Sequence, residues 1–165
     1  MPQDRTSFGP ERDLMVIDEI CQLKYRYLRW LDLKRWDELS GCFTDDATAS
    51  YSGGQYEFAG RDEIMEFLVE SLGPKFVTMH QCHHPEIVVD GDRATGRWAL
   101  QDTVLMTEYK LILQGAAFYE DRYLWADGAW RIAHTGYVRT FEYLISLDDL
   151  PSFRVTANRW AAATG

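Results

Sequence analysis

Apolar residues recur at helical spacing near the start of the chain, with charged residues between them. The stripe consists of Leu14, Ile17, Cys21, Leu28 and Leu31. This spacing predicts an amphipathic helix over about residues 14–33. A short second helix is expected over residues 36–43. A third amphipathic helix is expected over residues 62–72, ended by Gly73 and Pro74.

The rest of the chain has the pattern of strands. Two short strands, over residues 47–51 and 56–59, are separated by a turn that contains Gly53 and Gly54. After Pro74 the pattern changes to long strands. Four of them are expected, over residues 75–89, 93–106, 115–125 and 130–141. Asp90-Gly91-Asp92 and Ala126-Asp127-Gly128 supply the tight turns of two hairpins.

Helices followed by a meander of strands indicate an α+β fold rather than an alternating parallel one. A single helix-backed sheet of this length must curve or leave a large face exposed. We therefore expect a cone-shaped, curved antiparallel sheet that wraps around the N-terminal helices and encloses a pocket. Residues 1–12 are expected to form a flexible lead and residues 13–146 the domain. Residues 147–165 would be a C-terminal strap and short helix that covers the pocket mouth or a partner subunit.

Composition narrows the range of partners. The 165 residues are 46% hydrophobic and 14% aromatic, as in a single folded domain. The net charge of −9 argues against nucleic acid and against an anionic membrane surface. No apolar run approaches the ~20 residues that span a bilayer, and residues 1–12 lack the apolar region of a secretory signal. Cys21, Cys42 and Cys82 show no disulfide spacing, so we expect a reducing, cytoplasmic location.

Asp102 lies on a strand face that is otherwise apolar. The same face carries Trp98, Leu100, Val104 and Met106. A carboxylate in such a row costs several kcal/mol unless it is paired, hydrogen-bonded or protonated. Asp102 is therefore a candidate site residue. The alternative is a satisfied buried aspartate at a bend of the sheet.

Asp32 shares a helical stripe with Cys21 and Leu28, so its side chain is expected to point toward the core. It also lies near the helix C-terminus, where a negative charge opposes the macrodipole. Two penalties at one residue suggest a functional role. The alternative is a structural ion pair with Lys34 or Arg35.

One short segment contains three of the four histidines of the chain. Strand alternation places His80, Cys82 and His84 on one face of the strand and His83 on the other. A bulge at Pro85 would change this arrangement.

Three interpretations of these histidines are open. Histidine and cysteine are good metal ligands, but no carboxylate-rich set completes a site, so no metal is expected. His80 could instead act as a general base beside Asp32, because a carboxylate that accepts an imidazole N–H fixes the tautomer and raises its basicity. The third interpretation is a set of polar residues at a strand end.

Two tyrosines precede Asp32 by one to two helical turns. A buried phenol can donate a hydrogen bond to a carbonyl oxygen, which makes Tyr25 and Tyr27 candidates; core packing is the alternative. A dry pocket would also take large side chains from the sheet. The candidate lining consists of Tyr25, Tyr51, His83, Trp98, Leu100, Phe118, Trp125 and His134.

Arg139 lies in an aromatic stretch of the last strand, where a guanidinium could clamp an anionic group. It could equally form an ion pair with Glu142 or Asp148. His134 falls on the opposite face of this strand if alternation is unbroken.

Seven motifs follow one another from Leu14 to Glu142. They lie at residues 27–32, 36–39, 42–47, 60–64, 80–87, 90–94 and 128–132. In this order they resemble the motifs of SnoaL-like proteins of the nuclear transport factor 2-like superfamily, which have a cystatin-like α+β fold. The pattern is most similar to scytalone dehydratase and bile acid 7α-dehydratase. The superfamily also includes isomerases, cyclases, dehydrochlorinases and non-enzymatic binding proteins, so the motifs are more specific for fold than for function.

The resemblance implies roles for five residues, which are Tyr27, Asp32, His80, Asp102 and Arg139. The first two match a tyrosine and an aspartate on the first helix of those enzymes, and the third matches their strand histidine. The fourth matches a position on the next strand that is histidine in some relatives and aspartate in others. The fifth matches, by a loose alignment, a late arginine of the bile acid enzymes. If the histidine strand is bulged, His83 could take the place of His80.

These observations favour a cofactor-independent lyase, such as a dehydratase, or an isomerase. His80 and Asp32 would remove a proton α to the carbonyl of a hydrophobic cyclic compound. Tyr27, helped by Asp102 if it is protonated, would stabilise the enolate oxygen or protonate a leaving hydroxyl.

The main alternative is a non-catalytic domain for ligand binding or assembly. In such a domain Asp32 and His80 would be separated, or buried against fixed partners with no open cavity beside them. A small subunit of a ring-hydroxylating dioxygenase ranks lower, because those subunits lack this buried polar set. A homo-oligomer, either a dimer or a trimer, is expected in addition, with Tyr119, Tyr123 and Tyr143 on an exposed sheet face.

Overall fold

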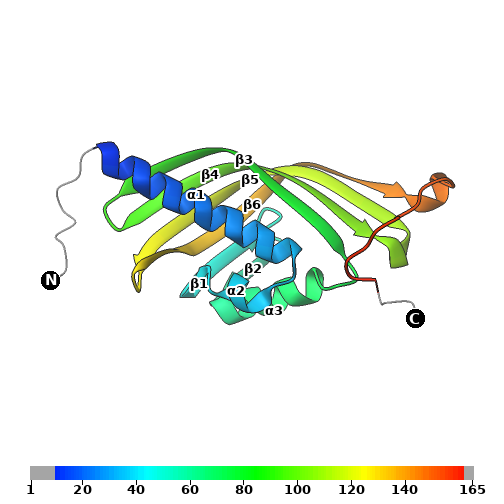
Figure 1. The fold of residues 1–165 in the computed structure, drawn as a ribbon, viewed down its shortest axis with the longest axis horizontal. Helices are drawn as coiled ribbons and strands as arrows, with labels where there is room; N and C mark the ends of the chain where they lie inside the picture. Colours follow the sequence, from blue (N-terminus) through cyan, green and yellow to red (C-terminus); the bar gives the residue numbers. More distant parts are fainter. Residues whose placement is uncertain (1–9, 162–165) are drawn as a thin grey trace.

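The computed structural model describes residues 10–161 and contains three α-helices and six strands in this range (Figure 1). The helices are α1 (Pro10–Asp32), α2 (Trp36–Ser40) and α3 (Arg61–Ser71). The strands are β1 (Phe43–Tyr51), β2 (Tyr56–Ala59), β3 (Val77–Asp90), β4 (Arg93–Met106), β5 (Leu111–Ala126) and β6 (Ala129–Ser146). Short 3-10 turns follow β4 at Thr107–Tyr109 and β6 at Leu147–Asp149. The α+β class predicted from the sequence is confirmed.

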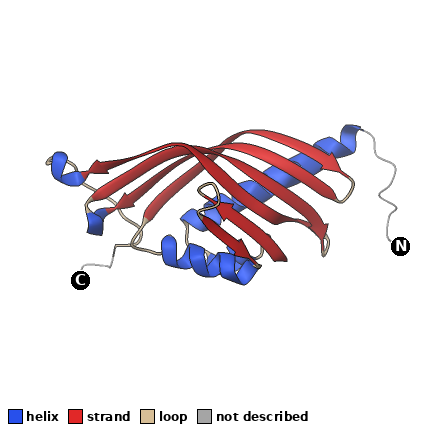
Figure 2. Cartoon of the chain, turned by 180° about the vertical axis from the view of Figure 1, so that it is seen from behind, coloured by secondary structure: helices blue, strands red, loops and turns tan. Residues whose placement is uncertain are grey.

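The six strands form one sheet in the order β2-β1-β6-β5-β4-β3. All neighbours are antiparallel except β1 and β6, which run parallel. The sheet is therefore mixed rather than wholly antiparallel, because the long connection through α3 and β3–β5 brings β6 back beside β1. Figures 1 and 2 show the sheet curving over α1, with α2 and α3 beside β1 and β2.

Irregularities in the strand pairing accompany the curvature. The β3–β4 register shifts between His83 and Glu86, and the β5–β6 register shifts at two places. An extra residue on one strand bends that strand and increases its twist. The bent strands leave a concave face on which α1 lies.

A buried ion pair joins α1 to this concave face. Lys24 Nζ lies 2.7 Å from Asp121 Oδ2, and both side chains are fully buried. Asp121 also accepts hydrogen bonds from the hydroxyl groups of Tyr123 (2.7 Å) and Thr135 (2.8 Å). The Lys24 ammonium lies 3.5 Å from the ring centroid of Tyr119. A buried carboxylate with three donors is well compensated, so the pair fixes the helix against β5.

Several element boundaries differ from those expected. α1 begins at Pro10, so residues 10–12 are helical rather than a flexible lead. Proline suits a first helical turn, because its missing N–H would have no partner there. The other residues of the expected lead, 1–9, lie outside the described residues.

The second half of the chain also departs from the expected boundaries. β5 begins at Leu111 rather than at residue 115, and β6 ends at Ser146 rather than at residue 141. Leu111 and Ser146 are paired with one another. No helix follows Leu147–Asp149 up to residue 161, and residues 162–165 lie outside the described part. The second helix ends at Ser40 because Phe43 already pairs in β1.

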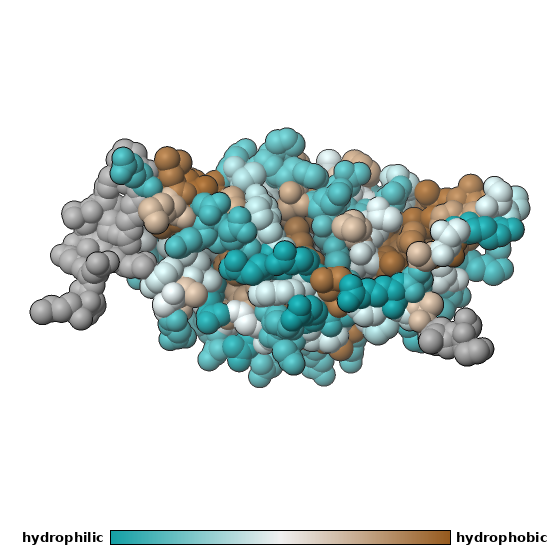
Figure 3. Space-filling view, in the orientation of Figure 1, coloured by the Kyte–Doolittle hydropathy of each residue, from teal (hydrophilic) through white to brown (hydrophobic). Residues whose placement is uncertain are grey.

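Two residues expected on an exposed sheet face are instead in the core. Tyr119 and Tyr123 are each 2% exposed, because alternation turns them toward α1 together with Asp121; Tyr143 is exposed. Figure 3 shows hydrophobic surface near both ends of the molecule. Leu14 of α1 and Leu144 of β6 are among the exposed large hydrophobic residues. No helix within residues 10–161 is long and apolar enough to cross a membrane.

The Lys24–Asp121 pair gives the first testable prediction. Lys24→Met leaves an uncompensated carboxylate in the core, so the free energy of unfolding should fall by about 3–5 kcal/mol in a denaturant titration. Lys75→Met, at an exposed lysine, is the matched control and should change it by less than about 0.5 kcal/mol. A loss for Lys24→Met as small as that of the control would contradict the anchoring role.

Candidate active site

The end of α1 and the start of β3 bring Asp32 and His80 into direct contact. His80 Nδ1 lies 2.7 Å from Asp32 Oδ1, and the His80 backbone N–H donates to Asp32 Oδ2 at 2.8 Å. The Thr78 hydroxyl donates to Asp32 Oδ1 at 2.8 Å. The side chains of Asp32 and His80 are only 12% and 8% exposed. The inward orientation predicted for Asp32 from the helical stripe is therefore observed.

These contacts determine the tautomer of His80. Three donors surround the Asp32 carboxylate, and this favours its ionised, acceptor-only form. Nδ1 of His80 must then carry the hydrogen that lies between the two side chains. Nε2 keeps its lone pair and is the nitrogen that can accept a proton.

Asp102 and Arg139 form a second charged pair beside the first. Asp102 is the register partner of His80 on the neighbouring strand. Its two carboxylate oxygens accept from the two Nη atoms of Arg139 at 2.6 and 2.8 Å. Arg139 Nε lies 3.1 Å from a carboxylate oxygen of Glu142. Burial alone would lower the pKa of Arg139, but its hydrogen bonds to Asp102 and the charge of Asp102 raise that pKa above the ordinary value.

This arrangement bears on the roles expected for Asp102 and for Arg139. Asp102 accepts through both oxygens, so it is a carboxylate and does not serve as the protonated helper of Tyr27. Arg139 has carboxylates on both of its edges, Asp102 and Glu142. Of the alternatives left open for it, the ion pair with Glu142 is observed, and the pairing with Asp102 was not expected. Gly115 makes room for the guanidinium, since a Cβ there would lie 2.7 Å from Arg139 Nη1.

A cavity of about 500 Å³ is lined by His80 from the first pair and by both Asp102 and Arg139 from the second. Its polar wall includes His80, Asp102, Arg139 and Glu142, together with the phenols of Tyr27, Tyr51, Tyr119 and Tyr137. Its apolar wall comes from α1, α3, the connection between α3 and β3, and the strands β4 and β5, and includes Leu31, Phe67, Leu68, Phe76, Val104 and Leu113. A mostly apolar hollow with a few convergent polar groups is typical of a small-molecule site.

Two phenols in the cavity wall are suited to donate hydrogen bonds. Tyr27 is 1% exposed and Tyr51 is 3% exposed. Burial, as the largest cause, raises the pKa of both side chains above the ordinary tyrosine value. Both hydroxyls therefore stay protonated at neutral pH. Tyr27 lies five residues before Asp32 on α1 and lines the cavity together with His80.

Most of the predicted lining residues lie elsewhere; among the eight, Tyr51 is the one that lines the cavity. Trp98 and Leu100 do share the face of Asp102, but they are fully packed in the core. Trp98 contacts the ring of Tyr25 and donates to the hydroxyl of Tyr123. The alternation of side chains therefore predicted the correct face of β4. However, α1 covers this face around Trp98 and Leu100, and only its other end, at Asp102 and Val104, is open to the cavity.

The other five predicted lining residues are outside the cavity for different reasons. Tyr25 and His83 border a different hollow, a groove between α1 and the β3 edge to which Asp32 and His80 also contribute. Trp125 packs edge-on against Trp130, where β5 turns into β6. Phe118 and His134 lie on the opposite face of the sheet.

The structure also distinguishes between His80 and His83. The bulge expected near Pro85 is present, and His84 has a φ of 49°. This bulge comes after His83, so side chains alternate regularly between the two faces from His80 to His83. His83 is exposed. Within residues 10–161, no three His, Cys, Asp or Glu side chains are grouped as metal ligands.

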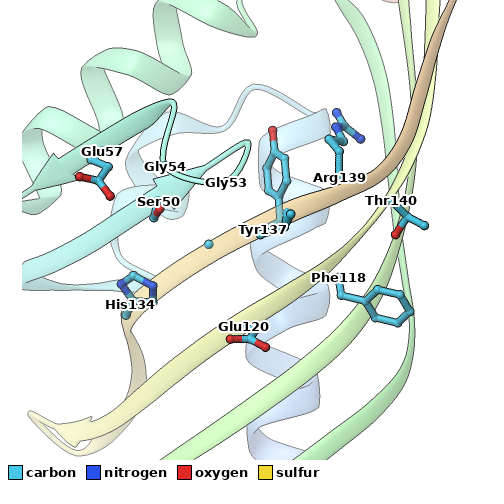
Figure 4. A pocket seen from close by; sticks show the side chains of 12 residues that line it. Ser50, Gly53, Gly54, Glu57, Phe118, Glu120, His134, Tyr137, Arg139 and Thr140 are labelled. Atoms are coloured by element: carbon cyan, nitrogen blue, oxygen red, sulfur yellow. The ribbon is translucent and has the colours of Figure 1, made fainter.

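A second hollow, of about 520 Å³, lies on the other face of the sheet (Figure 4). Figure 4 shows Tyr137 and Arg139 projecting from β6 away from Phe118 and Glu120. His134 Nδ1 lies 2.7 Å from the Thr48 hydroxyl, and burial is the main cause that lowers the pKa of His134. This hollow contains neither Asp32 nor His80, so it is not the candidate active site.

Sequence reasoning missed two polar residues around the site. Lys24 lies seven residues from both Ile17 and Leu31, so its place on the apolar stripe could have been recognised. Thr78 carried no such signal, because a threonine in a strand is ordinary. Lys34 was considered only as a possible ion-pair partner of Asp32, and the structure joins the two through Thr78.

Comparison with known proteins places the chain in a family. The family model of the SnoaL-like domain matches residues 12–136. The uncharacterised protein Rv2910c of Mycobacterium tuberculosis is 27% identical over 133 residues, which cover 77% of this chain and 87% of that protein.

Solved structures support the same fold. A scytalone dehydratase-like protein of Novosphingobium aromaticivorans superimposes with a TM-score of 0.76 at 22% identity, covering 91% of this chain and 95% of the other. Hexachlorocyclohexane dehydrochlorinase LinA-type3 of Novosphingobium barchaimii gives 0.74 at 17% identity, covering 83% and 94%. The family model covers most of the helices and of the sheet, and it includes both Asp32 and His80. The chain therefore belongs to the SnoaL-like domain family.

Proposed function

We propose that the protein is a cofactor-independent lyase or isomerase that removes a proton α to the carbonyl of a hydrophobic cyclic compound. The observation that carries this proposal is the 2.7 Å contact of His80 with Asp32 at the wall of a largely apolar cavity. A carboxylate-supported imidazole with a free Nε2 is a general base, and a cavity of this kind suits a hydrophobic substrate.

The reaction would begin at Nε2 of His80. The C–H bond α to the carbonyl breaks, its proton moves to Nε2, and its electron pair moves through the new C=C bond onto the carbonyl oxygen. Asp32 stabilises the resulting imidazolium, while Tyr27 and Tyr51 donate hydrogen bonds to the enolate oxygen. A lyase then expels a group β to the carbonyl, whereas an isomerase returns the proton to another carbon.

The names of the two structural relatives are consistent with this chemistry. One is described as similar to a dehydratase and the other is a dehydrochlorinase, so both names denote eliminations of a small molecule. Their sequence identities support the fold alone, and the proposal for this chain depends on its own site.

The alternative of a non-catalytic binding domain is not favoured. It predicted that Asp32 and His80 would lie apart, or would be buried with no open cavity beside them. Instead the pair lies at hydrogen-bond distance, and His80 lines the cavity.

The general-base role predicts the effect of two substitutions. The protein is incubated in D₂O with a panel of steroid and aromatic-polyketide ketones, and proton NMR measures the exchange of their α-hydrogens for deuterium. The protein should catalyse this exchange in members of the panel. This readout needs no knowledge of a leaving group. His80→Gln and Asp32→Asn should each slow the exchange by about 10²–10⁴-fold. His83→Gln, an exposed neighbour, is the control and should retain the rate; full exchange by both site variants would overturn the proposal.

The phenol donors give a separate prediction. Tyr27→Phe should lower the exchange rate by about 10²–10³-fold with little change in KM, because the bond to the enolate is stronger in the transition state. Tyr25→Phe, on the exposed side of the same helix, should have no such effect. Burial raises the pKa of the Tyr27 phenol, so ionisation of this group should cause no loss of rate up to about pH 9. A loss in KM alone would instead indicate a role in binding.

A further inference from the structure

Lys34 occupies a backbone position that normally belongs to glycine. After α1 ends at Asp32, the Arg35 N–H donates to the Trp30 carbonyl at 2.9 Å and the Lys34 N–H donates to the Leu31 carbonyl at 3.2 Å. These two bonds form the Schellman ending of a helix, in which the residue at the Lys34 position is left-handed. Lys34 has a φ of 56°, which costs free energy for any residue with a Cβ.

The side chain of Lys34 is also buried at a cost. The residue is 8% exposed, and its ammonium donates to the Thr78 hydroxyl at 2.9 Å. Burial, offset in part by the charge of Asp32, lowers the pKa of Lys34 to about 8. Lys34 thus carries its charge at neutral pH and loses it as the pH rises through about 8.

The hydrogen bonds of Thr78 have one possible direction. An ammonium only donates, so the Thr78 oxygen accepts from Lys34 and its single hydrogen points to Asp32. The chain of contacts then runs from Lys34 through Thr78 to Asp32 and on to His80. A positive charge at the start of this chain stabilises the Asp32 carboxylate and disfavours a second positive charge on the His80 ring.

We propose that Lys34, acting through Thr78, is a positioning residue that keeps Asp32 ionised and His80 uncharged, and so ready to accept a proton. The inference rests on the proposed general-base function of His80. It explains why the helix ends in a strained, buried lysine where glycine would be less costly. Without Lys34, the Asp32 charge would favour the imidazolium form of His80, which cannot accept a proton.

Other charged groups around His80 do not replace Lys34. On the neighbouring strands, Arg139 is paired with Asp102 on one edge and with Glu142 on the other. These three groups carry a combined charge of −1, which would itself favour a protonated His80. Arg29 of α1 borders a groove that Asp32 and His80 also line. Lys34 differs from Arg29 and Arg139 in that a chain of hydrogen bonds, through Thr78, joins it to Asp32.

The test uses Lys34→Gly, because glycine suits the left-handed position and removes the charge. The acid limb of the pH profile of exchange should move up by about one unit, so that the rate on this limb falls about tenfold. The rates of the wild type and the variant should converge above about pH 8, where Lys34 itself loses its charge. A proton NMR titration of the His80 ring should show the same upward shift of its midpoint without any substrate.

Stability gives an independent readout on the same variant. Because burial penalises charged Lys34, the folded state binds fewer protons than the unfolded state between about pH 8 and the ordinary pKa of 10.5, and the cost is fully present below pH 8. Lys34→Gly should therefore leave the thermal midpoint unchanged or raise it at pH 7. A drop in stability together with a uniformly lower rate would mean a merely structural role.

Three further variants complete the comparison. Lys34→Arg keeps the charge and should leave the acid limb within about 0.3 units of its original place. Thr78→Ser keeps the hydroxyl and should behave like the wild type, whereas Thr78→Val should shift the limb in the direction of Lys34→Gly.

The outcomes separate the inference from the proposed function. If Lys34→Gly and Thr78→Val leave the His80 midpoint in place while His80→Gln abolishes exchange, the inference about Lys34 is wrong and the general base stands. If the midpoint moves but His80→Gln keeps full exchange, the electrostatic coupling is real and the proposed function is wrong.

Discussion

The ion pair of Lys24 with Asp121 is the contact on which the site depends. It is fully buried and joins the middle of α1 to β5. Tyr27 lies about one turn after Lys24 on the same helix, and Asp32 lies about two turns after it. A rigid helix anchored at one point transmits its position along its length. The pair therefore fixes where the phenol and the carboxylate stand relative to the sheet that carries His80.

The buried charges of the site occur in compensated groups. Asp32 has His80 and Thr78 as partners, and Asp102 has both nitrogens of the Arg139 fork. Burying an ion without a partner is costly, so these groups can exist beside an apolar cavity only because each is paired. The same pairing leaves Arg139 no free edge for an anionic substrate. This is consistent with the hydrophobic carbonyl compound of the proposed function.

The sequence predicted the fold and part of the site. The predictions that succeeded and those that failed have different physical reasons. Helical and alternating patterns report which face of an element is buried, and they correctly turned Asp32 and Asp102 inward. They do not report what covers each part of that face, so Trp98 and Leu100 were placed in the cavity although α1 packs over them. The parallel pairing of β1 with β6 depends on contacts across most of the chain and has no local signal.

The central claim is that Asp32 holds His80 in the tautomer that presents a basic Nε2. Long-range ¹H–¹⁵N NMR correlations of the His80 ring, recorded above the pH at which the ring loses its proton, test this directly. The account predicts a protonated Nδ1 and an unprotonated Nε2, and it predicts that this preference is lost in Asp32→Ala. A wild-type ring with its proton on Nε2 would contradict the account, because that nitrogen could not accept a proton from a substrate.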